Sequence, residues 1–160
     1  MKPVRITLGL IAALAAACQG PTVPSVPLET LLSAPEQVAV TGRTLTLETT
    51  VWRDFMPGDN AGGSELMAVA LITAQDRQPY PTGLDADKVW VIYGDEVWEA
   101  DFTDESGPPS QARLYQLEKK AYGGPKWEPG VEVEVVVRLV PALGARQLLR
   151  VSGQKIGMTV

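Results

Sequence analysis

The chain of 160 residues contains no histidine and only one cysteine. A Ser-His-Asp or Cys-His catalytic set is therefore excluded within the chain, as is a histidine-ligated zinc, iron or copper site. An internal disulfide is excluded too, because it needs two cysteines. The formal charge of −5 argues against a nucleic-acid partner, since such partners bind basic surfaces. We expect no cofactor.

Long hydrophobic runs are also lacking. Residues 6–17 form an uncharged, mostly apolar stretch after Lys2 and Arg5, but a transmembrane helix needs ~20 apolar residues. A positive start, a short apolar run and small residues at its end are typical of a secretory signal. We therefore expect the protein to be exported.

Small residues end this stretch immediately before the single cysteine, Cys18. Residues 1–18 thus resemble the signal peptide of bacterial lipoproteins, although that family most often has leucine where this chain has Ala15. The resemblance implies that the Cys18 sulfur receives a diacylglycerol, that cleavage occurs just before it, and that the new amino group is acylated. Because Gln19 replaces the aspartate that favours the inner membrane, the resemblance implies an anchor in the outer membrane. It covers residues 1–18 only.

A second interpretation uses the same residues. Ala15-x-Ala17 also fits the small-x-small rule of ordinary secretory cleavage. That cleavage would release a soluble protein with a free thiol at its new N-terminus.

Proline spacing marks the next segment. Pro21, Pro24 and Pro27 recur at every third position, which favours an extended, polyproline-like tether because proline fixes φ and lacks an amide hydrogen. A short turn at 28–32 could dock on the domain. The expected organisation is a signal peptide (1–17), a lipidated cysteine with its tether (18–35) and one folded domain (36–160).

From residue 37 onward, the pattern is that of short strands separated by turns. Apolar and polar residues alternate through 44–52 and 131–140, which is typical of half-buried strands. Segment 111–121 fits a helix or a strand, and we favour a strand. The other expected strands are 37–40, 66–73, 88–93, 96–102, 147–152 and 156–160.

Many short strands without βαβ alternation predict an all-β fold. We expect a two-layer antiparallel β-sandwich, immunoglobulin-like in outline, with a closed β-barrel as the alternative. Trp90 and Trp98 are expected in the core, paired across a hairpin.

Aromatic residues gather in two loop regions. Trp52 to Phe55 ends a strand and enters one loop, and Tyr122 to Trp127 lies in another that is rich in glycine and proline. If these loops share one end of the sandwich, they form a shallow cleft suited to a sugar or a peptide. The predicted binding residues are Trp52, Arg53, Asp54, Phe55, Tyr122, Lys126 and Trp127.

The alternative for these residues is structural. Tryptophans can plug the open end of a sandwich, and Arg53 can pair with Asp54 or stack on Trp52.

Two short motifs could carry chemistry. Ser152 and Lys155 match Ser-x-x-Lys of penicillin-binding proteins, but that motif needs a helix, lies here in a β region and lacks its usual companion motifs. Asp85 and Asp87 begin like a calcium loop, but its glycine and distal glutamate are missing. Paired carboxylates could also serve a glycoside hydrolase.

These observations favour a lipid-anchored, non-enzymatic envelope protein that binds a protein, peptide or glycan at the periplasmic or cell surface. One alternative is a carboxylate-based hydrolase of envelope glycan. The other is a purely structural spacer or assembly lipoprotein.

Overall fold

The computed structural model describes residues 24–58, 62–103 and 112–160, so the predicted signal peptide and Cys18 lie outside the described residues. The described part is almost entirely β-structure with one short helix, α1 (Leu28–Leu32). The strands are β1 (Gln37–Val40), β2 (Arg43–Asp54), β3 (Leu66–Ala74), β4 (Leu84–Tyr93), β5 (Glu96–Asp101), β6 (Gln116–Gly124), β7 (Glu132–Pro141), β8 (Gln147–Lys155) and β9 (Gly157–Thr159).

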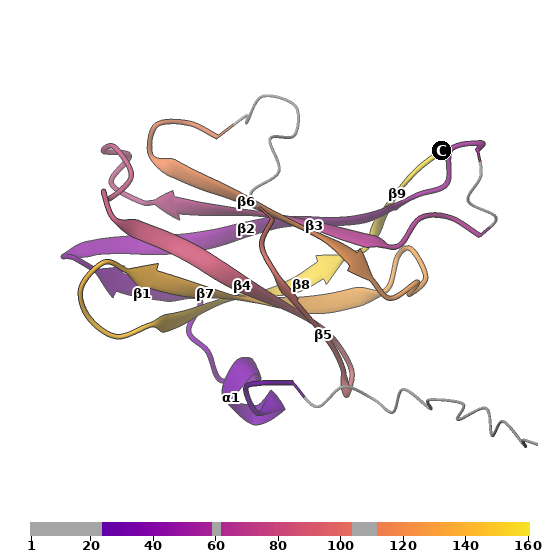
Figure 1. Cartoon of the computed structure of the whole chain (residues 1–160), viewed down its shortest axis with the longest axis horizontal. Coiled ribbons are helices and arrows are strands. Elements are labelled where there is room, and N and C mark those ends of the chain that lie inside the picture. The colour runs from indigo at the N-terminus through magenta and orange to yellow at the C-terminus, as the bar shows by residue number, and fades with distance from the viewer. Residues whose placement is uncertain (1–23, 59–61, 104–111) are drawn as a thin grey trace, which may run out of the picture.

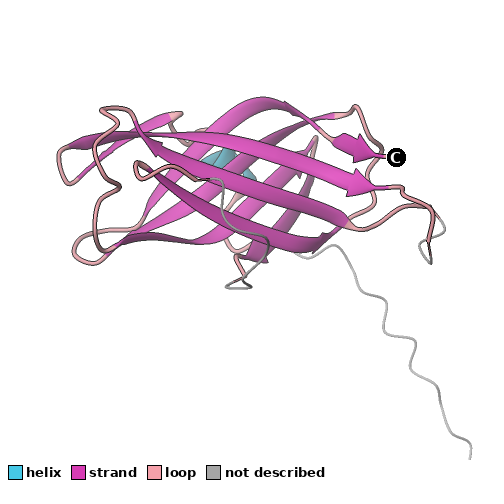
Figure 2. Ribbon diagram, turned by 90° about the horizontal axis from the view of Figure 1, so that it is seen from above, coloured by secondary structure: helices cyan, strands magenta, loops and turns pink. Residues whose placement is uncertain are grey.

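The strands form two sheets that pack face to face (Figures 1 and 2). Sheet A has the order β1-β2-β3-β6, with β9 added beside β2, and sheet B has the order β5-β4-β7-β8. All pairings are antiparallel except that of β9 with β2. The predicted β-sandwich is confirmed, and the two sheets do not close into the alternative barrel.

The strand order differs from that of an immunoglobulin domain. There, the second and third strands lie in opposite sheets, whereas here β2 and β3 are paired neighbours in sheet A. The likeness to immunoglobulins therefore extends to the two-layer outline and not to the topology.

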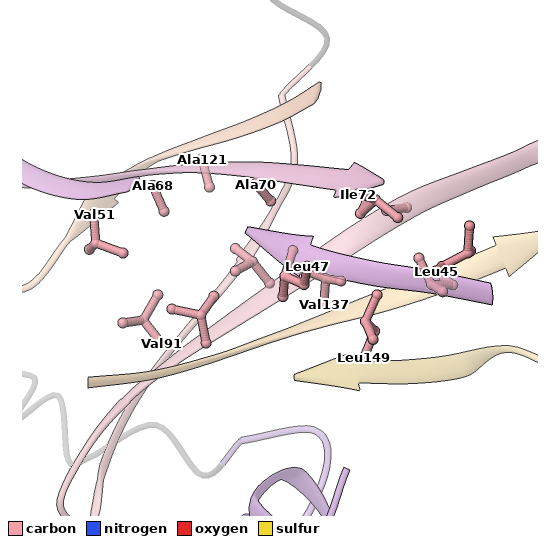
Figure 3. Packing of buried hydrophobic residues seen from close by; sticks show 14 of the residues in the cluster. Leu45, Leu47, Val51, Ala68, Ala70, Ile72, Val91, Ala121, Val137 and Leu149 are labelled. Atoms are coloured by element: carbon pink, nitrogen blue, oxygen red, sulfur yellow. The ribbon is translucent and has the colours of Figure 1, made fainter. Parts of the chain in front are cut away.

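The main core lies between the sheets, where every second side chain points inward (Figure 3). On β2, Leu45, Leu47 and Val51 are buried, as the alternation in the sequence predicts. Alternate residues of the neighbouring strand β3, including Ile72, lie beside them in sheet A, and those of β7, including Val137, face them from sheet B. Period-two burial on both sheets is what holds the layers together.

Strand β6 differs from its predicted bounds. The segment is a strand, as we favoured, but it begins at Gln116 and continues through Gly124, where we expected a loop. The pairing register with β3 shifts near Leu66, and Gly123 has a φ of +89°. An extra residue in one strand produces such a β-bulge, and glycine supplies the positive φ at little steric cost.

The two central tryptophans occupy opposite faces of sheet B. Trp90 is fully buried on the outer face, and Trp98 packs against the core between the sheets. In the register, Trp98 lies opposite Val91 and Trp90 lies opposite Glu99. The predicted pairing of the two tryptophans is therefore wrong, because adjacent register positions of a hairpin alternate between faces.

A second hydrophobic cluster covers the outer face of sheet B. Leu31 of α1 and Ala34 are buried against Trp90, Ile92 and Val136. Figure 1 shows α1 below this sheet, on the side away from sheet A. The described part of the segment that we expected to be a tether thus packs on the domain, and we call residues 24–36 the strap.

Polar contacts hold the strap at its two ends. At one end, the Ser25 backbone N–H and hydroxyl each donate to the Glu99 carboxylate at 2.7 Å. At the other end, the Arg150 guanidinium donates to the Ala34 carbonyl at 3.0 Å, and the backbone N–H of Arg150 donates to the Pro35 carbonyl at 2.9 Å. The strap is therefore fixed along its length by apolar packing and hydrogen bonds.

Glu99 has an unusually low pKa for a glutamate. Burial alone would raise its pKa, but hydrogen bonds from Ser25 and from the Lys88 ammonium, 2.9 Å away, lower it to about 2. The carboxylate is thus charged in the folded protein over nearly the whole accessible pH range.

Replacing Glu99 by glutamine should lower the free energy of unfolding at neutral pH. The folded pKa of about 2 lies below the ordinary value of 4.5, so the charged group stabilises the fold above pH 4.5, and this contribution disappears as the pH falls toward 2. We expect the difference between wild type and Glu99→Gln, measured by urea unfolding, to shrink over that range.

Glu128→Gln, at an exposed loop position, is the matched control and should change little at any pH. A Glu99→Gln effect that stays constant from pH 7 to pH 2 would contradict the assignment of the stabilisation to the carboxylate.

Candidate binding surface

The two loops with predicted binding residues do lie at the same end of the sandwich. One leads from β2 to β3, and the other leads from β6 to β7. Arg53, at the end of β2, joins them and is only 2% exposed. Its guanidinium donates to four carbonyl oxygens, those of Gly62 (2.6 Å), Ser64 (2.8 Å), Trp127 (3.0 Å) and Lys126 (3.2 Å).

The neighbours of Arg53 complete a loop-bracing cluster. The Arg53 guanidinium carbon lies 4.8 Å from the centre of the Phe55 ring, which in turn packs so closely on Gly63 that a Cβ there would approach it to 2.6 Å. Asp54 accepts a hydrogen bond from the Met56 backbone N–H at 2.9 Å. Arg53 is therefore a structural residue, whose side chain braces the two loops and is not free to contact a ligand. It does not form the pair with Asp54 that we also considered.

Trp127 plugs this end of the sandwich, as the structural alternative predicted. Its indole N–H donates to Glu96 at 2.9 Å, and its ring centre lies 5.7 Å from that of Tyr93. The side chain is partly buried against the main core. Trp127 thus ties the loop after β6 to the hairpin of β4 and β5.

The other three predicted residues, Trp52, Tyr122 and Lys126, lie on an exposed surface. Trp52 projects from the outer face of sheet A, next to Met67 of β3 in the register. Tyr122 follows the buried Ala121 at the bulge of β6 and is 41% exposed. Glu118, Lys120 and Tyr122 alternate with the inward-facing residues of β6, so the Tyr122 ring lies on the same face as Trp52.

This outer face carries three ordered rows of side chains. In the pairing register, Thr50, Val69 and Lys120 form one row, and Glu48, Leu71 and Glu118 form the next. Trp52, Met67 and Tyr122 form the row nearest the loops. The central strand β3 thus supplies an apolar stripe of Met67, Val69 and Leu71.

Two open hollows follow this stripe. The larger, of about 770 Å³, lies over the rows and is bordered by Met158 at the β9 edge. The smaller, of about 400 Å³, lies at the loop end and adds Glu65 and Lys126. Both are lined by Met67 and Tyr122, so they form one continuous surface, which we call the sheet A groove.

Sequence reasoning missed the apolar stripe of β3. A nearly uninterrupted apolar strand such as 66–73 indicates burial on both faces, and the sequence gives no sign that one face lacks a cover. The missing signal is topological, because only the pairing with β2 and β6 shows which side chains share that face.

Asp85 and Asp87, the two carboxylates considered for calcium, have cationic partners. Asp85 lies 3.0 Å from the Lys119 ammonium, and Asp87 accepts two hydrogen bonds of 2.7 Å from Arg138. The bonds from Arg138 lower the pKa of Asp87, whereas a catalytic acid needs a raised pKa. Over 24–58, 62–103 and 112–160, no three potential metal ligands cluster.

The Ser-x-x-Lys motif lies on strand β8, where the register with β7 shifts between its two residues, and not on the helix that it needs. The Ser152 hydroxyl donates to Glu36 at 2.7 Å. The side-chain arrangement that this motif needs on a helix is therefore not formed.

Together, the fold and the groove define a mainly antiparallel β-sandwich whose described residues cover one outer face and leave the other open. Within the described residues, no helix is both long and apolar enough to cross a membrane. No protein-family model, curated protein or solved structure matches the chain.

Replacing Arg53 by methionine should lower the free energy of unfolding by more than about 2 kcal/mol, because several carbonyl oxygens lose a charged donor. Urea unfolding followed by tryptophan fluorescence measures the change. Arg77→Met, at an exposed turn position, is the control and should stay close to wild type. Equal stability of the two variants would show that Arg53 does not brace the loops.

Proposed function

We propose that this protein is a lipid-anchored, non-enzymatic module of the cell envelope that binds a segment of a partner protein in the sheet A groove. The observation that carries the proposal is the contrast between the two outer faces. The strap covers the apolar outer face of sheet B, whereas the apolar stripe of sheet A lies in an open groove.

The composition of the groove supports a protein partner. Tryptophan, tyrosine and methionine are enriched in the buried centres of protein interfaces, where they contribute large contact areas. Here, Trp52 and Tyr122 flank Met67 at one end, and Val69 and Leu71 extend the apolar surface along β3. An apolar strip of this length suits a polypeptide segment better than a single sugar ring stacked on one aromatic face.

The attachment of the strap supports the proposed anchor. Residues 19–23 alone separate Cys18 from Pro24, the first described residue, and a stretch of that length spans at most about 20 Å when fully extended. Ser25 is bonded to Glu99 on the outer side of sheet B. A lipid on Cys18 would therefore hold sheet B toward the bilayer and leave the groove facing away from it.

Lipidation at Cys18 is tested by labelling the full-length protein with radioactive palmitate in its native cells. We expect label in the wild type and none in Cys18→Ala, because no other thiol exists in the chain. Gln19→Ala, which keeps the cysteine, should remain labelled. A mature protein with an unmodified N-terminal thiol, seen by mass spectrometry, would establish ordinary secretory cleavage instead.

Binding in the groove is tested by photo-crosslinking in native cells with a crosslinking amino acid at position 69. We expect discrete crosslinked products that Trp52→Ala and Tyr122→Ala reduce several-fold, because both remove apolar contact area. A crosslinker at position 143, an exposed site on the β7–β8 turn, is the control. Identical products at both positions, or none at position 69, would contradict binding in the groove.

Comparing the crosslinks with the stability of the same variants distinguishes a lost contact from a lost fold. Trp52 is partly buried and Tyr122 is exposed, so their alanine variants should retain most of their stability in urea. A large stability loss with unchanged crosslinks would assign these aromatics to folding alone.

A further inference from the structure

The charges on the outer face of sheet A are not balanced among themselves. Glu48 on β2 and Glu118 on β6 flank Leu71 in one row of the register. The Lys120 ammonium lies 3.1 Å from Glu118 and neutralises it. Glu48 is exposed, and no ion pair joins it to another described residue.

The two ends of the groove therefore differ in chemistry. The loop end presents Trp52, Met67 and Tyr122, which favour apolar contacts. At the opposite end, the groove reaches Leu71, and the register places the exposed carboxylate of Glu48 next to Leu71, at the rim of the groove. Neighbouring strands lie about 4.8 Å apart, so a single segment laid along β3 over the apolar stripe also reaches this carboxylate on β2.

The chain itself shows how such a face is covered. On sheet B, Leu31 and Ala34 of the strap bury Trp90, Ile92 and Val136. At the rim, strap donors satisfy a carboxylate that projects from the sheet, as Ser25 does for Glu99. On sheet B, an apolar stripe with a rim carboxylate is thus covered by an amphipathic segment with a donor at its edge.

We propose that the sheet A groove binds an amphipathic segment of a partner protein that carries a lysine or arginine positioned to pair with Glu48. This inference rests on the proposed function and specifies the chemistry of the partner. The apolar side of the segment covers Met67, Val69 and Leu71, and the cation gives the complex its orientation. The net charge of −5 further favours encounter with a basic segment.

The test uses two synthetic amphipathic helical peptides as probes. Both have the same leucine positions, and one carries lysines where the other carries glutamates. Fluorescence anisotropy with the folded, mature protein measures Kd. We expect the lysine peptide to bind, the glutamate peptide to bind much more weakly, and Glu48→Lys to weaken the lysine peptide about tenfold.

A matched control separates the local contact from the net charge. Glu29→Lys makes the same change in charge on α1, which covers the opposite outer face. It should alter the affinity much less than Glu48→Lys does. Raising the salt concentration should reduce the difference between the two variants, because exposed charges are screened.

Each other outcome overturns the inference in a recognisable way. Equal binding of both peptides, or equal effects of Glu48→Lys and Glu29→Lys, excludes a basic partner, while a loss of binding in Trp52→Ala would still support the groove. Binding that neither Trp52→Ala nor Glu48→Lys affects places the peptide elsewhere and removes support for both proposals. Failure of both peptides to bind also overturns the inference. If a wild-type dimer is then dissociated by Val69→Asp in sedimentation, the groove is a contact between two copies of this chain.

Discussion

Sheet B is apolar on both of its faces, and this constraint shapes the whole domain. One face packs against sheet A to form the main core, but Trp90, Ile92 and Val136 on the other face need a separate cover. The strap supplies it from the N-terminal side of the first strand. Since burial of apolar area is the main favourable term in folding, the strap is part of the folded domain and not merely a connection to it.

The use of the strap on sheet B leaves sheet A without a cover of its own among the described residues. The resulting asymmetry gives the molecule one side on which α1 lies (Figure 1) and an opposite side with a groove. The loop end of that groove is held in place by Arg53, whose buried guanidinium binds carbonyls of two loops that are far apart in the sequence. A buried cation with many carbonyl partners provides rigidity without exposing a charge.

The resemblance of residues 1–18 to a lipoprotein signal complements this geometry. The proposed anchor at Cys18 would lie close in sequence to the strap, so the covered side of the sandwich would be the side near the point of attachment. The groove would then lie on the side that remains free for a partner. The aromatic and methionine side chains of the groove support the proposed binding role.

Local patterns in the sequence predicted much of the fold. Alternation through β2 and β7 identified the inward faces correctly, because the period of a strand is a property of the local backbone. The same reasoning failed for Trp90 and Trp98, since the register of a hairpin decides which of two nearby residues shares a face. For the predicted site, local reasoning left open whether both loops share one end, and it could not separate the bracing residue Arg53 from the groove residues Trp52 and Tyr122.

The sequence by itself determined the β class of the domain, the inward side of its most regular strands and the absence of histidine chemistry. These follow from residue identity and from spacing along a single strand. Only the tertiary structure decided that residues 24–36 form a strap, that Arg53 is buried and that Met67, Val69 and Leu71 line an open groove. Those outcomes depend on contacts between segments distant in the chain, and such contacts leave no periodic signal in the sequence.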